Sequence, residues 1–224
     1  MGEMNSRTDR PASGADRTAR RGLVTVLSGC MFSGKTTELL RQLTSLKSGA
    51  GVAFKHLIDD RYRCDALVSH AGKSYSAFAV SSPSRMLEHL HSAVELIAID
   101  DAHFFATDLG PIVERWAESG IDVIVACLDL DSWGRPFPLC RDLCSIADQS
   151  VTTYAICARC GSVGDRTQRL TPIVDGRLVG GPESYEPRCK RCWRPPPEAR
   201  PGESPMQNMA EASESIRLPR SVSR

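Results

Sequence analysis

The amino-acid sequence predicts an α/β fold, in which helices flank a mostly parallel β-sheet and a small metal-binding subdomain follows. Three observations support this prediction. Apolar runs alternate with helical patterns over residues 22–150, a glycine-containing motif at Gly29–Thr36 follows the first apolar run, and two Cys-x-x-C pairs lie within residues 151–194. We therefore expect an α/β domain at 22–150, a cysteine-rich subdomain at 151–194 and a tail at each end.

Five apolar runs are predicted to be strands. The first four do not alternate between polar and apolar residues, so they are expected to lie buried in a parallel sheet. The expected strands are Leu23–Leu27, Gly51–Phe54, Leu96–Ile99, Val123–Ala126 and Val151–Ile156.

Helical patterns fall between these runs, as the crossover connections of a parallel sheet require. Gly49 and Gly120 stand just past two of them as candidate C-terminal caps. The expected helices are Thr37–Lys47, Pro83–Ala93, Leu109–Glu118 and Cys140–Ala147.

The two ends of the chain are predicted to be disordered tails. Residues 1–21 are rich in Arg, Ser and Asp without periodicity, and residues 195–224 open with three prolines and remain polar. A short helix at Met206–Ile216 is possible, but its apolar face is thin.

The segment Gly29–Thr36 has the features of a phosphate-binding loop, and an ordinary strand-to-helix turn is the less favoured alternative. Its glycines allow backbone N–H groups to point at phosphate oxygens, and the following helix presents the positive end of its dipole. Lys35 offers a charge to the outer phosphates and Thr36 a hydroxyl to Mg²⁺. The motif therefore predicts binding of a nucleoside triphosphate by Gly29, Cys30, Met31, Phe32, Ser33, Gly34, Lys35 and Thr36.

Two carboxylates, Asp100 and Asp101, follow the predicted strand Leu96–Ile99. Ligands of open α/β sheets bind beyond the carboxyl ends of the strands, so both acids are expected to face the phosphate site. One can hold the Mg²⁺ shell and the other can act as a general base. The next residues include Phe104 and Phe105, which either pack in the core or stack on a planar base.

The pairs Cys157/Cys160 and Cys189/Cys192 are typical of a tetrahedral zinc site with four sulfur ligands. Four protein ligands leave no open position, so the site is expected to be structural. A redox role is the alternative. The other five cysteines, predicted to be buried apolar filler, are Cys30, Cys64, Cys127, Cys140 and Cys144.

The overall composition excludes several classes of protein. Lys and Arg number 28 against 27 for Asp and Glu, so no basic field indicates a stable nucleic-acid partner. No apolar run is long enough to cross a membrane, and the N-terminus lacks the apolar segment of a secretory signal. Cytoplasmic localisation follows as the default expectation.

Together these elements closely resemble the cytosolic-type thymidine kinases, the type II, zinc-containing and tetrameric class. The resemblance runs from about Leu23 to Trp193. Its most specific pieces are Met-Phe-Ser inside the phosphate loop, the strand-end acids followed by Phe-Phe, and the segment Val179–Cys189. Asp59–Tyr62, Ser69–Gly72 and Leu128–Phe137 also align with segments of that family.

The resemblance implies a P-loop NTPase-like sheet of RecA type and a kinase that uses ATP, Mg²⁺ and a structural Zn²⁺ to phosphorylate thymidine at its 5′-hydroxyl. Asp101 would be the general base, Thr36 and Asp100 would hold Mg²⁺, and Lys35 and Arg61 would counter the charge of the transferring group. ATP would also contact Ala102 and His103. A homotetramer is implied by the resemblance alone.

The resemblance also implies a nucleoside site. The segment from about Asp165 to Tyr185 would be a lasso-like loop that the zinc holds at both ends, which lowers its ordering entropy. Met31 and Phe104 would flank the base, and Tyr185 would hold the sugar. The implied nucleoside-binding residues are Met31, Phe104, Ser132, Thr167, Gly176, Arg177, Leu178, Val179, Gly180 and Tyr185.

Three positions depart from the family pattern. Asp101 stands in place of Glu, which shortens the base by one methylene, and a misplacement of about 1 Å can cost on the order of 10²-fold in rate. His103 replaces Gln, and Ser132-Trp133 replaces a segment that carries a phenylalanine. A catalytically attenuated nucleotide-binding sensor is therefore the alternative function. A helicase-like interpretation of Asp100–His103 is disfavoured, because such a motor needs two domains of this kind.

Overall fold

The computed structural model describes residues 20–59, 65–69, 72–172 and 179–197. Both predicted tails lie almost wholly outside this range, as does the possible helix at Met206–Ile216. The helices are α1 (Lys35–Thr44), α2 (Pro83–Met86), α3 (Leu109–Glu118) and α4 (Pro138–Ile146), with short 3₁₀ turns η2 (Leu87–His89) and η3 (Ala102–Phe104). The strands are β1 (Val24–Gly29), β2 (Gly51–His56), β3 (Ala66–Val68), β4 (Ser74–Ser76), β5 (Phe78–Val80), β6 (Leu96–Asp100), β7 (Asp122–Cys127), β8 (Gln149–Thr153), β9 (Ala155–Ile156), β10 (Val163–Gly164), β11 (Arg166–Arg169) and β12 (Tyr185–Arg188).

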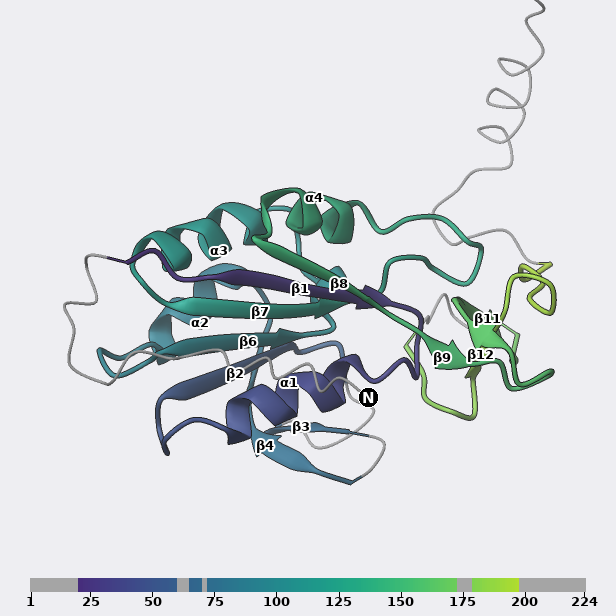
Figure 1. The fold of residues 1–224 in the computed structure, drawn as a ribbon, viewed down its shortest axis with the longest axis horizontal. Helices are drawn as coiled ribbons and strands as arrows, with labels where there is room; N and C mark the ends of the chain where they lie inside the picture. Colours follow the sequence, from purple (N-terminus) through teal and green to yellow (C-terminus); the bar gives the residue numbers. More distant parts are fainter. Residues whose placement is uncertain (1–19, 60–64, 70–71, 173–178, 198–224) are drawn as a thin grey trace, which may run out of the picture.

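Six strands form one sheet in the order β5-β2-β6-β7-β1-β8. Every pairing in this sheet is parallel. Strand β1 lies between β7 and β8: strands β2, β5, β6 and β7 lie on one side of it and β8 on the other. The strand order therefore reverses at β1, and ligands of such sheets bind at this switch point, where the loop after β1 lies. This arrangement confirms the predicted P-loop NTPase-like α/β fold (Figure 1).

Helices cover both faces of the sheet, with α3 and α4 on one face and α1 on the other (Figure 1). Alternate residues of one strand point to different sides: Ile97 and Ile99 of β6 pack with α3 and α4, whereas Leu96 and Ala98 pack with α1. Burial on both faces explains why these strands read as continuous apolar runs.

The small C-terminal subdomain contains two antiparallel pairs, β9 with β10 and β11 with β12. It lies beyond the carboxyl ends of the sheet strands, on the side where the loop after β1 emerges (Figure 1). The sheet therefore presents its ligand-binding edge to this subdomain.

Four strands of the main sheet and helix α3 occur where the sequence predicted them. The predicted strand Val151–Ile156 is wrong as one element, because the chain leaves the main sheet at Tyr154: β8 pairs with β1, and β9 pairs with β10. The sheet therefore extends to Thr153, past the residue 150 at which we ended the α/β domain.

The predicted helix Pro83–Ala93 is also wrong over most of its length. Helix α2 ends at Met86, a 3₁₀ turn reaches His89, and Leu90 is extended. The His89 ring stacks on Phe78 with centroids 3.9 Å apart, and this tertiary contact accompanies the early end of the helix.

The two candidate caps have different outcomes. Gly120 lies directly past Ser119, the cap of α3, and adopts a φ of 82°, so its prediction is confirmed. Gly49 has a φ of 83°, but α1 already ends at Thr44 with Ser45 as its cap. The Gly49 prediction was therefore wrong, and this glycine serves a turn before β2 instead.

A disulfide joins Cys127 and Cys140, which corrects the prediction that both are unpaired filler. Cys127 ends β7 and Cys140 lies in the first turn of α4. Both are buried in the same apolar cluster, and their Cα atoms are 5.9 Å apart, a separation that a disulfide spans. Cys30 is buried and unbridged as expected, Cys144 is half-buried, and Cys64 lies outside the described residues.

Candidate active site

The loop between β1 and α1 curls tightly because two of its glycines take backbone conformations that side chains disfavour. Gly29 has a φ of 142°, and a Cβ there would lie 2.3 Å from the carbonyl oxygen of Thr153. Gly34 has a φ of 89° and starts helix α1 as its N-cap. The loop thus directs the amino end of α1 into the pocket that it encloses.

Lys35 is buried at the centre of this loop. Its ammonium donates hydrogen bonds to the carbonyl oxygens of Gly29 at 3.0 Å and Cys30 at 2.7 Å. Burial lowers the pKa of Lys35, and the charge of Asp101 opposes that shift. A lysine held in this way places one positive charge on the inner wall of an anion site.

The two strand-end acids occupy different positions. Asp100 is buried and accepts a 2.8 Å hydrogen bond from the Thr36 hydroxyl. Burial, together with the nearby charge of Asp101, raises the pKa of Asp100 to about 7. Thr36 and Asp100 thus bring two oxygen ligands together beside the loop, a donor set that fits Mg²⁺.

Asp101 holds an unusual backbone conformation, with a φ of 48°. Among the described residues, only Asp101 and Phe32 combine a side chain with a positive φ, and both line the pocket at the phosphate loop. Such conformations cost about 1–3 kcal/mol and gather at functional sites.

Two cavities meet in this region. The smaller follows the phosphate loop and is lined by Ser33, Lys35, Thr36 and Asp100, among others. The larger has a volume of about 630 Å³ and mainly apolar walls. The residues that line both cavities are Met31, Asp101 and Leu128. Asp101 therefore lies where a polar, phosphate-sized pocket opens into a cavity of a size suited to a small organic ligand.

The structure brings together most of the predicted nucleoside-binding residues around the larger cavity. The Tyr185 hydroxyl, at one wall, accepts a hydrogen bond from the Arg169 guanidinium. The predicted residues that line this cavity are Met31, Phe104, Ser132, Thr167, Val179, Gly180 and Tyr185. The predicted residues Gly176, Arg177, Leu178 and Arg61 lie outside the described part of the chain.

Two residues predicted to contact ATP do not line the smaller cavity. Ala102 is fully buried in the core next to Asp101 and lines neither cavity. His103 lines the larger cavity, and its Nδ1 accepts a 3.3 Å hydrogen bond from the Leu128 amide. Both residues belong to the 3₁₀ turn η3, which begins directly after Asp101.

A buried ion pair at the smaller cavity was not predicted from the sequence. Lys55 is 2% exposed and lies 3.5 Å from the Asp59 carboxylate, and both line this cavity. The signal was present, because Lys55 directly follows the buried apolar run of strand β2. Lysine is almost never fully buried unless it is paired, and the Asp59 carboxylate provides that partner here.

Asp129 is a further acid near the site that was not predicted from the sequence. Burial raises the pKa of Asp129, while the charges of Lys35 and Arg166 lower it. Lys35 therefore interacts with Asp100, Asp101 and Asp129 together. Such a concentration of negative charge needs cations to balance it.

The phosphate loop contacts the small subdomain directly. The Met31 amide donates to the Thr167 hydroxyl at 3.1 Å, and the Cys30 thiol lies 3.5 Å from the Gly164 carbonyl oxygen. Ser33 and Thr153 hydroxyls are 2.6 Å apart. The loop is thus held by β8, β10 and β11 as well as by its own strand.

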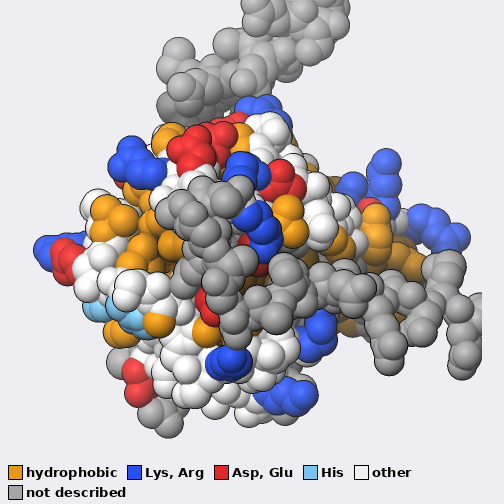
Figure 2. Space-filling view, turned by 60° about the vertical axis from the view of Figure 1, so that its left-hand side comes forward, with side chains coloured by type: hydrophobic (Ala, Val, Ile, Leu, Met, Phe, Trp, Pro, Cys, Tyr) orange, Lys and Arg blue, Asp and Glu red, His pale blue; other side chains and the backbone are white. Residues whose placement is uncertain are grey.

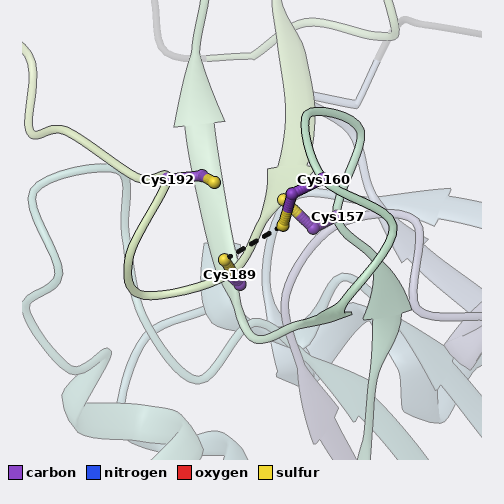
Figure 3. Close-up of side chains that lie close together, drawn as sticks. All are labelled: Cys157, Cys160, Cys189 and Cys192. Carbon is purple, nitrogen blue, oxygen red and sulfur yellow. Dashed lines mark hydrogen bonds between the residues drawn. The ribbon is translucent and has the colours of Figure 1, made fainter.

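The four paired cysteines converge as predicted (Figure 3). Their sulfur atoms all lie within 4.8 Å of one another, and the Sγ atoms of Cys160 and Cys189 are 3.7 Å apart. Tetrahedral zinc with Zn–S bonds of about 2.3 Å has sulfur–sulfur edges of about 3.8 Å, so the cluster fits Zn²⁺. Hydrogen bonds from the Ser162 hydroxyl and amide lower the pKa of Cys160 to about 6, which favours the thiolate that a metal requires.

Two further observations concern the helices and the surface of the described residues. None of their helices has both the length and the apolar character needed to cross a membrane. On the face shown in Figure 2, basic and acidic side chains are interspersed and form no continuous basic strip.

The fold and the site define a P-loop nucleotide-binding protein with a cysteine cluster that can bind zinc. The family model for thymidine kinase matches residues 22–193, so the chain belongs to the thymidine kinase family. This span includes the phosphate loop, both strand-end acids and all four clustered cysteines.

One solved structure with similarity to this chain is the genome packaging NTPase B204 from Sulfolobus turreted icosahedral virus 2 in complex with ATP-gammaS. The two chains share 14% sequence identity, with a TM-score of 0.36 over 60% of this chain and 75% of that one. A likeness at this level carries no weight in the assignment.

Proposed function

We propose that this chain transfers the γ-phosphoryl group of ATP to the 5′-hydroxyl of thymidine. Family membership supports thymidine phosphorylation in general. One observation supports the assignment of roles: Asp101 lies at the junction of the phosphate pocket and the larger cavity. A carboxylate at that point is within reach of a hydroxyl entering from one side and a phosphate held on the other.

The proposed roles follow from this geometry. Backbone N–H groups of the loop and the amino end of α1 bind the phosphates, and Lys35 neutralises the charge that develops during transfer. Asp101 accepts the proton of the attacking hydroxyl. Thr36 and Asp100 would hold Mg²⁺, which supplies charge neutralisation across the outer phosphates when bound. The cysteine cluster would hold a structural Zn²⁺ outside the reaction.

Arg61 is proposed as a second cation near the transferring group. We also propose a homotetramer, from the family resemblance, and a cytoplasmic location, as the default expectation from the composition. No observation in the described residues favours the alternative of a noncatalytic sensor.

The test is a coupled assay of ADP release with zinc-loaded protein, Mg²⁺ and a panel of nucleosides. We expect thymidine-dependent release that Asp101→Asn abolishes, with ATP affinity within about threefold of wild type, because Asp101 acts on the hydroxyl. Wild-type protein that binds ATP normally but shows no nucleoside-dependent release would disprove the proposal.

Asp101→Glu measures how far the shorter base limits the rate. A large gain in kcat would identify an attenuated kinase, whereas no gain would exclude the shorter side chain as the cause of a low rate.

A further inference from the structure

Residues 128–137 form a loop that supplies much of the wall of the larger cavity. Leu128, Leu130, Asp131, Ser132, Trp133 and Phe137 all line it. The loop connects β7 to α4, and the Cys127–Cys140 disulfide closes its base. A loop that forms a binding wall must be ordered before the ligand gains from it, and any ordering left to the binding step reduces affinity.

The tip of this loop is organised around Asp131. The Asp131 carboxylate accepts hydrogen bonds from the amides of Trp133 and Arg135, both at 2.9 Å. The Gly134 amide donates to the Asp131 carbonyl oxygen at 3.0 Å, which completes a tight turn. These bonds shape the tip but do not attach it to the rest of the protein.

Trp193 attaches the tip. Its indole N–H donates to the Ser132 carbonyl oxygen at 3.2 Å, across 61 residues of sequence. Its ring also covers Gly134 so closely that a Cβ there would lie 3.0 Å from the ring. One side chain thus provides a hydrogen bond and a packing surface to the same turn.

Trp193 is itself fixed from two sides. Its amide donates to the Cys189 carbonyl oxygen at 2.9 Å, and Trp193 directly follows Cys192 in the sequence; both cysteines belong to the cluster. The following residue, Arg194, exchanges two 2.8 Å hydrogen bonds with the Gln168 side chain on β11. The indole therefore extends from a rigid base formed by the second cysteine pair and β11.

We propose that Trp193 is a positioning residue that couples the zinc cluster to the nucleoside cavity by holding the 128–137 loop in its binding conformation. Trp193 does not line the cavity, so it acts on the ligand through Ser132 and Trp133. The cluster would then also support the part of the cavity wall that residues 128–137 form.

The first experiment uses hydrogen–deuterium exchange on unliganded, zinc-loaded protein. W193A should raise exchange at the amides of Trp133, Gly134 and Arg135, and W193F should raise it less, because it keeps a ring over Gly134. The matched control is K190A, which removes an exposed side chain from the same cysteine turn and should leave exchange unchanged.

The second experiment measures kinetics and affinity. We expect W193F to raise the KM and Kd for thymidine by about 2- to 10-fold, the cost of one neutral hydrogen bond, and W193A to raise them further. The kcat and the KM for ATP should stay within about threefold of wild type, and zinc content should be unchanged.

The two readouts separate failure of this inference from failure of the proposed function. The expected effect on thymidine rests on the proposed function. If wild-type protein shows no thymidine turnover, the kinetic measurement no longer applies, and hydrogen–deuterium exchange alone tests whether Trp193 holds the loop. Unchanged exchange over residues 128–137 in W193A overturns the inference, as does a fall in kcat at constant KM. If W193A loses zinc, W193F with full zinc content takes its place in both measurements.

Discussion

The phosphate end and the nucleoside end of the site are built from the chain in different ways. The phosphate end is built around one continuous run, Met31–Thr37, which supplies nearly half of its lining; the other lining residues are Lys55, Asp59, Ala66, Leu67, Val68, Asp100, Asp101 and Leu128. The nucleoside end gathers residues as distant as Met31 and Tyr185. A local site is determined by loop conformation and the α1 dipole, whereas a dispersed site depends on every contact that holds its segments together.

This difference predicts that the two ends can be damaged separately. Removing the metal cluster should affect the dispersed end far more than the local one. Substitutions in the phosphate loop should do the reverse, and changes far from both ends should affect only the stability of the fold.

Cys189→Ala should abolish zinc binding and with it most nucleoside binding. Because structural zinc contributes on the order of 10 kcal/mol to the folding of small domains, we expect thymidine affinity to fall by about 100-fold or more. ATP affinity should fall by less than about 10-fold, because the α1 amino end remains. Calorimetry and metal analysis provide the measurement, with Cys144→Ala as the control outside the cluster. Full thymidine affinity in zinc-free protein would contradict the contrast between the two ends.

Lys35→Met keeps the bulk of the side chain but removes its charge from the phosphate end. We expect kcat to fall on the order of 10²- to 10³-fold, as for loss of one preorganised donor in a buried site. Thymidine Kd should stay within about threefold of wild type. The control is Lys47→Met, an exposed lysine after α1. An equal loss of thymidine affinity would show that Lys35 also supports the nucleoside end.

Removing the disulfide with Cys127→Ala/Cys140→Ala should destabilise the fold and loosen the 128–137 loop. For a ring of this size we expect a loss of about 3 kcal/mol in the free energy of unfolding. Denaturant titration measures it, and thymidine affinity should weaken more than ATP affinity. A thiol reductant should lower the free energy of unfolding of the wild-type protein by a similar amount and leave that of the double variant unchanged. Identical stability of both proteins would mean that the bridge contributes nothing.

Asp148→Asn probes the start of β1, far from both ends of the site. The Val24 amide and Arg21 lower the pKa of Asp148, so its carboxylate stabilises the fold above its ordinary pKa. The variant should lose at most about 1 kcal/mol at neutral pH, because the group is partly solvent-exposed. The difference should shrink as pH falls below about 4. Asp142→Asn is the exposed control, and a difference that persists at low pH would exclude the charge as the cause.

Much of the fold was predictable because the sheet is buried on both faces. Strands such as Leu96–Asp100 lack alternation for that reason, and α3 follows its apolar spacing to both ends. The Pro83–Ala93 prediction failed because the local pattern does not encode tertiary contacts. One such contact, between Phe78 and His89, lies where the helix ends and Leu90 becomes extended. The early end of β8 likewise reflects the change of pairing partner between β8 and β9.

The site was predictable where its residues follow a short motif of fixed spacing. The phosphate loop and the cysteine pairs carry their spacing in the sequence, and the structure brings both sets together. The Cys127–Cys140 bridge was missed because composition cannot show that β7 and α4 bring those two sulfur atoms into contact. The position of His103 depends on η3, a turn that no sequence pattern indicated.

Met31 belongs to both ends of the site, and this has a thermodynamic consequence. Its amide is tied to Thr167, and the residue lines the phosphate pocket as well as the larger cavity. Any rearrangement of the loop around phosphates therefore moves one wall of the nucleoside cavity. Any coupling of the two substrates through Met31 is reciprocal: whatever factor ATP applies to nucleoside affinity, the nucleoside must apply to ATP affinity, in equal measure and with the same sign.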